Sequence, residues 1–156
     1  MTLLSFQEQY PDEFSHCYGC GRLNGGGLHV KSYWDGEESV CSFEPDPGHT
    51  SFPGFVYGGL IASVIDCHST GTAAAAAYRE EGREFGSDPP LRFVTASLHV
   101  DYLRPTPMGP PLVLRSRIVE TKERKIVVET DLTADGELCA RGTLVAVKIP
   151  DTMMGK

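Results

Sequence analysis

Apolar and polar positions along this chain follow two periods, one of about two residues and one of about 3.6 residues. Strand-like runs at residues 28–34 and 39–43 predict two short β-strands, and the Asp-Gly pair between them is typical of a hairpin turn. Over residues 57–79 the apolar positions recur at helical spacing, and a run of alanines adds strong helix propensity. The pattern therefore predicts a hairpin, a Pro- and Gly-rich loop and one long helix.

Four further strand-like segments follow the helix and give an α+β order of two strands, one helix and four strands. They are predicted at residues 92–103, 112–121, 126–132 and 138–149. A single helix is buried best against one antiparallel sheet when the sheet curls around it. The first of the four segments supplies an apolar face for this packing, made of Val94, Ala96, Leu98, Val100 and Tyr102. We therefore expect a curved sheet of about six strands around a central helix.

One carboxylate, Asp66, interrupts the otherwise apolar first half of the predicted helix. An ionised acid inside a protein is costly unless it has a partner, and such acids occur more often at functional sites than ordinary surface acids do. The neighbouring Cys67 and His68 do not form a nucleophile–base pair, because adjacent helical residues point about 100° apart. Asp66 is therefore the first candidate site residue.

Length and composition favour one globular domain. The 156 residues are enough for one core, and 40% of them are hydrophobic. We expect an N-terminal arm at residues 1–15, a single domain at 16–150 and a C-terminal tail at 151–156. No apolar run approaches the roughly 20 residues that span a bilayer, no signal peptide is visible, and the net charge is −7. These features predict a cytoplasmic protein without a nucleic-acid or membrane partner.

The five cysteines indicate reduced thiols, because their number is odd and the chain shows no export signal. The Cys17-Tyr18-Gly19-Cys20 segment supplies only two of the four ligands that a structural zinc site needs. His16, Cys41 or another subunit would have to complete such a site. We therefore expect no metal and no redox role for this pair.

The segment Tyr57-Gly58-Gly59 with Asp66 seven residues after the second glycine resembles a motif of the hot-dog fold acyl-CoA thioesterases, in their PaaI-like branch. In that family the motif is His-Gly-Gly, six further residues and Asp. Residues 95–105, TASLHVDYLRP, resemble the long central strand of the family, and the CYGCG segment resembles a lead-in found in some members. The resemblance covers most of the chain and implies the hot-dog fold, with a curved antiparallel sheet wrapped around one long helix.

The resemblance also implies roles for three residues of this chain. Asp66 takes the place of the general base or nucleophile, the backbone N–H of Gly59 that of the oxyanion donor, and Thr95 that of a hydroxyl that orients the water. A helix N-terminus presents unpaired N–H groups and positive potential, which suits the oxygen that becomes negative when a thioester carbonyl is attacked. No cofactor is implied.

The sequence departs from the family motif at two positions. Tyr57 stands where the family has histidine, and Ser51 stands where related enzymes have Asn or Gln. Both side chains can donate hydrogen bonds, and His49 lies in the same loop as a possible substitute. We therefore expect Tyr57 to act at the catalytic centre, and His49, Ser51 and Gly58 to contact the substrate.

The spacing of Gly59 and Asp66 carries a geometric consequence. Seven helical residues rise about 10 Å, so one thioester carbonyl cannot touch both groups of the same helix. A site that needs both is completed by a second, antiparallel helix. We therefore expect a homodimer with two shared sites, or a dimer of such dimers.

The leading prediction is hydrolysis of an acyl-CoA thioester to the free acid and CoA. Two alternatives remain open. A non-catalytic acyl-CoA binding or sensing module is compatible with Tyr57 and Ser51, and a hot-dog hydratase or dehydratase is suggested by His49 and the Phe52-Pro53-Gly54 segment.

Overall fold

The computed structural model describes residues 3–150 and 152. Two 3-10 turns precede six strands and one helix, and the bounds are Gln7–Gln9, Asp12–Phe14, β1 Tyr33–Asp35, β2 Glu38–Phe43, α1 Gly58–Glu80, β3 Phe93–Tyr102, β4 Leu112–Lys122, β5 Lys125–Ala134 and β6 Glu137–Lys148. The helix and five of the strands lie within about two residues of their predicted bounds. The first strand is shorter than predicted and begins only at Tyr33. The predicted tail at 151–156 lies outside the described residues apart from position 152.

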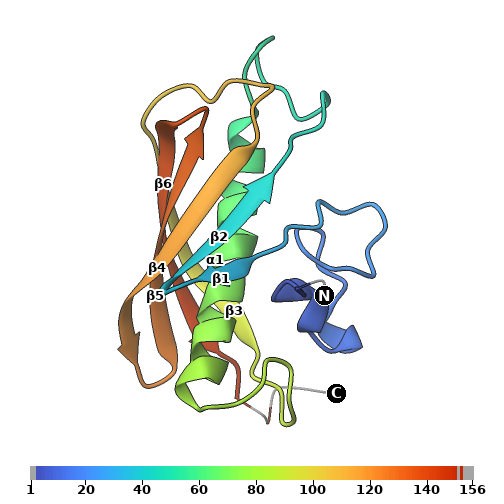
Figure 1. Cartoon of the computed structure of the whole chain (residues 1–156), viewed down its shortest axis with the longest axis vertical. Helices are drawn as coiled ribbons and strands as arrows, with labels where there is room; N and C mark the ends of the chain where they lie inside the picture. The colour runs from blue at the N-terminus through green and yellow to red at the C-terminus, as the bar shows by residue number, and fades with distance from the viewer. Residues whose placement is uncertain (1–2, 151, 153–156) are drawn as a thin grey trace.

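All six strands form one antiparallel sheet in the order β1-β2-β4-β5-β6-β3. The sheet curves along α1, which packs against one of its faces (Figure 1). One helix on a curved six-stranded antiparallel sheet is the hot-dog fold that the sequence predicts. No helix in the described part of the chain is long and apolar enough to cross a membrane, and the expected cytoplasmic location stays a prediction.

The helix is held against the sheet by a close-packed apolar core. Leu60, Ile61, Val64 and Ile65 of α1 are all buried, and they belong to one cluster with buried leucines of β4 and β5. Burying one such side chain stabilises the fold by about 1.5–3 kcal/mol. Gly142 of β6 is part of this fit, because a Cβ atom at that position would lie 2.6 Å from the Ile65 Cγ2 atom. Core packing therefore fixes the rotation of α1 and the direction in which Asp66 points.

A β-bulge at Ala96 corrects the predicted alternation of β3. Thr95 and Ser97 pair with consecutive residues of β6, so Ala96 is the extra residue. The bulge reverses the side-chain parity of the strand. Leu98 therefore packs against the core as predicted, whereas Val94 and Ala96 are exposed and Thr95 contacts α1 instead. A simple period of two cannot place Thr95 and Leu98 on the same face, and the bulge does so.

The described part of the predicted N-terminal arm, from residue 3 onward, packs on the rest of the domain. Phe6 is buried and contacts the rings of Trp34 and Phe85, with centroids 5.3 and 5.8 Å away. Gln7 reaches α1 at Gly71, where an added Cβ atom would lie 2.6 Å from the Gln7 amide nitrogen. The N-terminal segment thus covers part of α1 that the sheet leaves uncovered (Figure 1).

His68 lies on the buried face of α1 in a hydrogen-bond network that requires a neutral imidazole. The Gln7 amide donates to the Ser32 hydroxyl, and the Ser32 hydroxyl lies 2.7 Å from His68 Nδ1. On the other side of the ring, Ser39 Oγ lies 3.2 Å from Nε2 and 2.6 Å from Thr72 Oγ1. Thr72 in turn donates to the His68 carbonyl oxygen at 2.7 Å.

These donors and acceptors have one consistent arrangement. Thr72 gives its proton to the His68 carbonyl oxygen, so the Ser39 hydroxyl donates to Thr72 and can only accept from the ring. The proton of the neutral ring therefore lies on Nε2, and the Ser32 hydroxyl donates to Nδ1. A second ring proton on Nδ1 would leave the Ser32 hydroxyl without its acceptor. Burial accordingly lowers the pKa of His68 to about 3. The structure confirms that Cys67 and His68 form no pair, since His68 points into the core.

We predict that His68 makes the protein less stable in mild acid. Its folded pKa lies below the unfolded value of about 6.5, so its contribution to stability is complete above about pH 6.5 and is lost as the pH falls toward about 3. Between pH 7.5 and pH 5 this group alone lowers the unfolding free energy by about 2 kcal/mol. Urea unfolding at both pH values, compared with His68→Gln at the same protein concentration, measures the difference. An equal pH dependence in both proteins would contradict it.

Candidate active site

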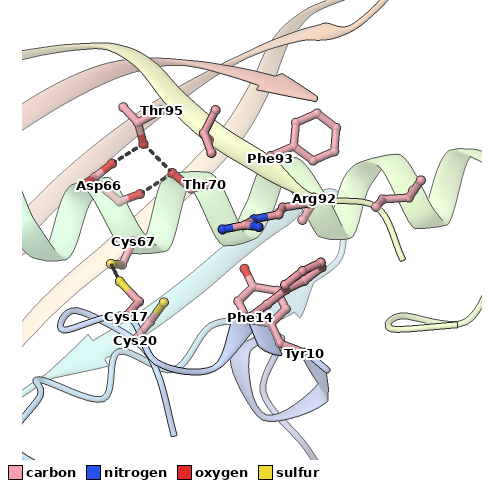
Figure 2. A pocket seen from close by; sticks show the side chains of 13 residues that line it. Tyr10, Phe14, Cys17, Cys20, Asp66, Cys67, Thr70, Arg92, Phe93 and Thr95 are labelled. Carbon is pink, nitrogen blue, oxygen red and sulfur yellow. Dashed lines mark hydrogen bonds between the residues drawn. The ribbon is translucent and has the colours of Figure 1, made fainter. Parts of the chain in front are cut away.

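Asp66 lies on the half-exposed side of α1, facing β3. The Thr95 hydroxyl donates to Asp66 Oδ1 at 2.6 Å, and the Thr70 hydroxyl lies 3.0 Å from the Thr95 hydroxyl (Figure 2). The Thr70 hydroxyl also donates to the Asp66 carbonyl oxygen at 2.8 Å, one helical turn back. The sequence does not single out Thr70, although its spacing of four residues from Asp66 is the signal that places the two on one helix face.

Counting protons shows which carboxylate oxygen is free. The Thr95 proton goes to Oδ1 and the single proton of Thr70 goes to the Asp66 carbonyl oxygen, so neither hydroxyl donates to Oδ2. Within residues 3–150, no donor lies within hydrogen-bonding distance of Asp66 Oδ2. The carboxylate is therefore held through one oxygen and retains the other as an acceptor for a molecule that enters from outside.

A cavity of about 230 Å³ opens beside this carboxylate. Its walls come from the N-terminal segment, α1 and the start of β3, and the side chains are Tyr10, Phe14, Cys17, Cys20, Asp66, Cys67, Thr70, Ala74, Leu91, Arg92, Phe93, Val94 and Thr95 (Figure 2). The Arg92 guanidinium lies over the Phe14 ring, 4.9 Å from its centroid. The cavity thus combines aromatic and aliphatic walls with one carboxylate and one cation. The sequence pattern does not predict that the N-terminal segment forms one of these walls.

The first turn of α1 carries a second group of predicted site residues. Helix α1 begins at Gly58, so the first N–H groups have no acceptor within the helix. Tyr57 donates its N–H to the His49 carbonyl oxygen at 2.9 Å, and no acceptor in the described chain contacts the Gly59 N–H. A Cβ atom at Gly59 would lie 2.5 Å from the Tyr57 ring, so glycine allows this ring to lie against the helix start. The Tyr102 hydroxyl donates to the Gly58 carbonyl oxygen at 2.8 Å.

His49 and Ser51 lie in the loop that leads into this turn. The Asp46 N–H donates to His49 Nδ1 at 2.9 Å, which leaves Nε2 to carry the proton of the neutral ring. The Ser51 N–H donates to the Phe55 carbonyl oxygen at 2.9 Å, which closes a tight turn. The backbone of this loop therefore positions both side chains near the start of α1.

The predicted site residues thus form two separate groups in one chain. Asp66 and Thr95 meet beside the cavity, together with Thr70. His49, Ser51, Tyr57, Gly58 and Gly59 gather around the helix start, and none of them lines the cavity. The axial rise of about 10 Å between Gly59 and Asp66 keeps the two groups apart.

The structure corrects the expected surroundings of the Cys17–Cys20 pair. The third nearby thiol belongs to Cys67 of α1, and neither His16 nor Cys41 joins the cluster. The sulfur atoms of Cys17 and Cys67 lie 3.8 Å apart. Hydrogen bonds from Cys20 and Cys67 lower the pKa of Cys17 to about 2, and the same bond to Cys17 raises the pKa of Cys20 to about 12.

Comparison with known proteins identifies the family. The model of the thioesterase superfamily matches residues 53–140, more than half of the chain. The chain belongs to the thioesterase superfamily. The matched stretch of this thioesterase-family chain includes Asp66, Thr95 and the glycine pair at the start of α1. Membership agrees with the resemblance that the sequence motifs indicate.

Individual relatives support the same assignment. The chain is 52% identical to a thioesterase superfamily protein from Shewanella loihica, with a TM-score of 0.68 over 89% of this chain and 98% of that one. It is 33% identical over 112 residues to acyl-coenzyme A thioesterase THEM4 of Xenopus laevis, which is 70% of this chain and 45% of THEM4. The chain therefore spans less than half the length of the curated relatives it matches. The Escherichia coli PaaI protein shares the fold, at 14% identity and a TM-score of 0.64 over 79% of this chain and 81% of that one.

Proposed function

We propose that this thioesterase-family protein hydrolyses acyl-CoA thioesters and that Asp66 is its general base. One observation carries the proposal: Asp66 is fixed through Oδ1 by Thr95 and keeps Oδ2 free on the wall of a mainly apolar cavity. An oriented carboxylate with a free oxygen can accept a proton from water. The name of the THEM4 relatives supports the acyl-CoA substrate class.

The reaction follows from the chemistry of these groups. A water molecule gives its proton to Asp66 Oδ2 while its oxygen attacks the thioester carbonyl carbon. The carbonyl oxygen becomes negative and accepts a hydrogen bond from the Gly59 N–H at the positive end of a helix. The carbon–sulfur bond then breaks, and the CoA sulfur recovers the proton from Asp66. The products are the free acid and CoA, and no cofactor takes part.

Each proposed site takes Asp66 from one subunit and Gly59 from another. Both groups must lie about 3 Å from the reacting atoms, whereas within one helix they are separated by about 10 Å. A two-fold axis that sets two α1 helices antiparallel brings the start of one beside the middle of the other. Tyr57, Gly58, His49 and Ser51 would then reach the substrate from the second subunit.

Strand β3 is the edge at which we place this two-fold axis. It has ten residues, it pairs on one side only with β6, and most of its side chains are exposed. A long exposed edge strand is a template for pairing with another chain. The opposite edge, β1, has only three residues and is a poorer template. Antiparallel pairing of two β3 strands would extend the sheet and place Thr95 near the subunit boundary.

A non-catalytic acyl-CoA binding module is the second candidate, because Tyr57 and Ser51 replace the residues that the family motif has at these positions. The two functions differ in one measurement. A module of this kind binds acyl-CoA and releases no thiol, whereas an enzyme releases free CoA thiol from a panel of acyl-CoA esters.

Replacing Asp66 by Asn should nearly abolish hydrolysis. The amide keeps the size of the side chain but cannot accept the proton, and loss of general-base catalysis lowers the rate by about 10² to 10⁴. The measurement is kcat for thiol release at saturating acyl-CoA. Asp135→Asn is the matched control, since Asp135 lies in the β5–β6 turn with a φ of 53°, which Asn accepts readily. Hydrolysis by Asp66→Asn at the rate of the control would contradict the assignment.

Thr95 should act as a positioning residue. Thr95→Val removes the hydroxyl that fixes Asp66 Oδ1, and a hydrogen bond to a charged group contributes roughly 1.5–3 kcal/mol. We expect kcat to fall by roughly 10- to 100-fold, with a much smaller change in KM. Thr95→Ser, which keeps the hydroxyl, should recover most of kcat. A Thr95→Val enzyme with normal kcat would show that Asp66 needs no such partner.

Two inactive variants should restore activity when their subunits mix. Asp66→Asn lacks the base, and Gly59→Pro lacks the N–H donor at a helix turn that tolerates proline. Random mixing by unfolding and refolding gives about half mixed dimers, and each has one intact and one doubly altered site. Recovery of about a quarter of wild-type activity is the expected result.

A control variant distinguishes the loss of the Gly59 N–H from a displacement of the Tyr57 ring. Any side chain at position 59 pushes against Tyr57, so Gly59→Ala reproduces this displacement while it keeps the N–H. We expect Gly59→Ala to remain far more active than Gly59→Pro. If mixed dimers form, both variants are folded and no activity returns, the site lies within one chain.

A further inference from the structure

Three cysteine thiols meet on the wall of the cavity beside Asp66. Cys17 and Cys20 come from the N-terminal segment, and Cys67 comes from α1, nearly fifty residues later. Their sulfur atoms all lie within 4.8 Å of one another (Figure 2). The proposed hydrolysis uses none of them, and among the described residues they are the only group of this kind with three ligand atoms so close together.

The backbone holds the cluster together. The Gly19 N–H donates to the Cys17 sulfur at 3.3 Å, and the Gly19 carbonyl oxygen accepts from the Val30 N–H at 3.0 Å. A Cβ atom at Gly19 would lie 2.2 Å from the Cys67 sulfur. Glycine at position 19 is therefore what allows the turn between the first two cysteines to close over the third.

The sequence predicts no metal at the Cys17–Cys20 pair, but it gives no sign that the Cys67 thiol joins the pair. With this third thiol in place, we propose that Cys17, Cys20 and Cys67 bind one zinc ion, with a fourth position open toward the cavity. Zinc binds thiolates at about 2.3 Å in a tetrahedral arrangement, which places neighbouring sulfur atoms about 3.8 Å apart. The Cys17–Cys67 separation is 3.8 Å. Binding to the three thiolates releases the thiol protons to solvent and involves no change of oxidation state.

A disulfide accounts for less of the geometry. A disulfide joins two sulfur atoms at about 2.05 Å and leaves the third thiol unused, whereas a metal ion uses all three. The N–H of Gly19 directed at the Cys17 sulfur favours a thiolate at that position, and thiolate is the form that metals bind. The zinc ion would fasten the N-terminal wall of the cavity to α1 directly beside Asp66.

Cobalt binding tests this site without reference to hydrolysis. The full chain is reduced, stripped of metal with a chelator and titrated with Co²⁺, whose thiolate complexes absorb strongly in the near-ultraviolet and visible range. We expect saturation at about one cobalt per chain, tetrahedral visible bands, and displacement of cobalt by one equivalent of zinc. Zinc should also raise the melting temperature of the stripped protein, because it binds the folded state.

Variants show whether the three thiols form the site. Cys17→Ser and Cys67→Ser should each weaken cobalt binding by at least about a hundredfold, since even outer-shell changes cost 10- to 100-fold. Cys139→Ser, at a buried thiol outside the cluster, should bind as the wild type does. Gly19→Ala keeps all three thiols but pushes the Cys67 sulfur away, so it should also weaken binding. Gly25→Ala is its matched control, because an added Cβ atom there meets nothing within 4 Å.

Two results would overturn the proposal. They are the absence of cobalt bands in the reduced protein, and cobalt binding by Cys67→Ser as tight as that of the wild type. Cys17 is exposed, so its serine variant is expected to fold, and circular dichroism checks this. Loss of hydrolysis in Asp66→Asn leaves the metal result unchanged, so the two proposals fail separately.

Discussion

Helix α1 has to be buried on nearly all sides, and the sheet alone cannot do this. The curved sheet covers the side that carries Leu60, Val64 and Ile65, and the N-terminal segment covers another part through Gln7. Between the sheet and the N-terminal segment, a strip of the α1 surface remains uncovered, and we call this strip the seam. Asp66 lies in this seam, half-buried, so a charged group is tolerated on a helix whose other residues in the first half are mostly apolar. The cavity is the visible part of the same seam.

The bulge at Ala96 allows Thr95 to face the carboxylate of Asp66 in this seam. Without the extra residue, β3 would direct either Thr95 or Leu98 toward α1, but not both. With the bulge, Leu98 completes the core while Thr95 holds Asp66 Oδ1. The same strand therefore packs Leu98 into the core and positions Asp66 through Thr95. The proposed chemistry takes place beside the bulge.

Most of the fold could be predicted from the sequence, because hydrophobic period and turn residues act locally. The site could be predicted only in part. Asp66 and Gly59 are predicted by motif spacing. Thr70 is not predicted, because a spacing of four residues from Asp66 marks a shared helix face but no particular role. The bulge is not predicted either, since Val94 and Ala96 are apolar and continue the alternation that the strand then abandons. The approach of Cys67 to the CxxC pair depends on how the N-terminal segment packs, and local patterns carry no information on a contact between residues so distant in the chain.

The proposed hydrolysis requires that each site take its base from one subunit and its oxyanion donor from another. A crystal structure of the protein with an acyl-CoA analogue, in which a methylene group replaces the thioester sulfur, tests this directly. A shared site places the ketone oxygen within hydrogen-bonding distance of the Gly59 N–H of one subunit, and it directs Asp66 Oδ2 of the other subunit, through a water molecule, at the ketone carbon. A ketone bound to Gly59 and Asp66 of the same chain, or held away from Asp66, would contradict it.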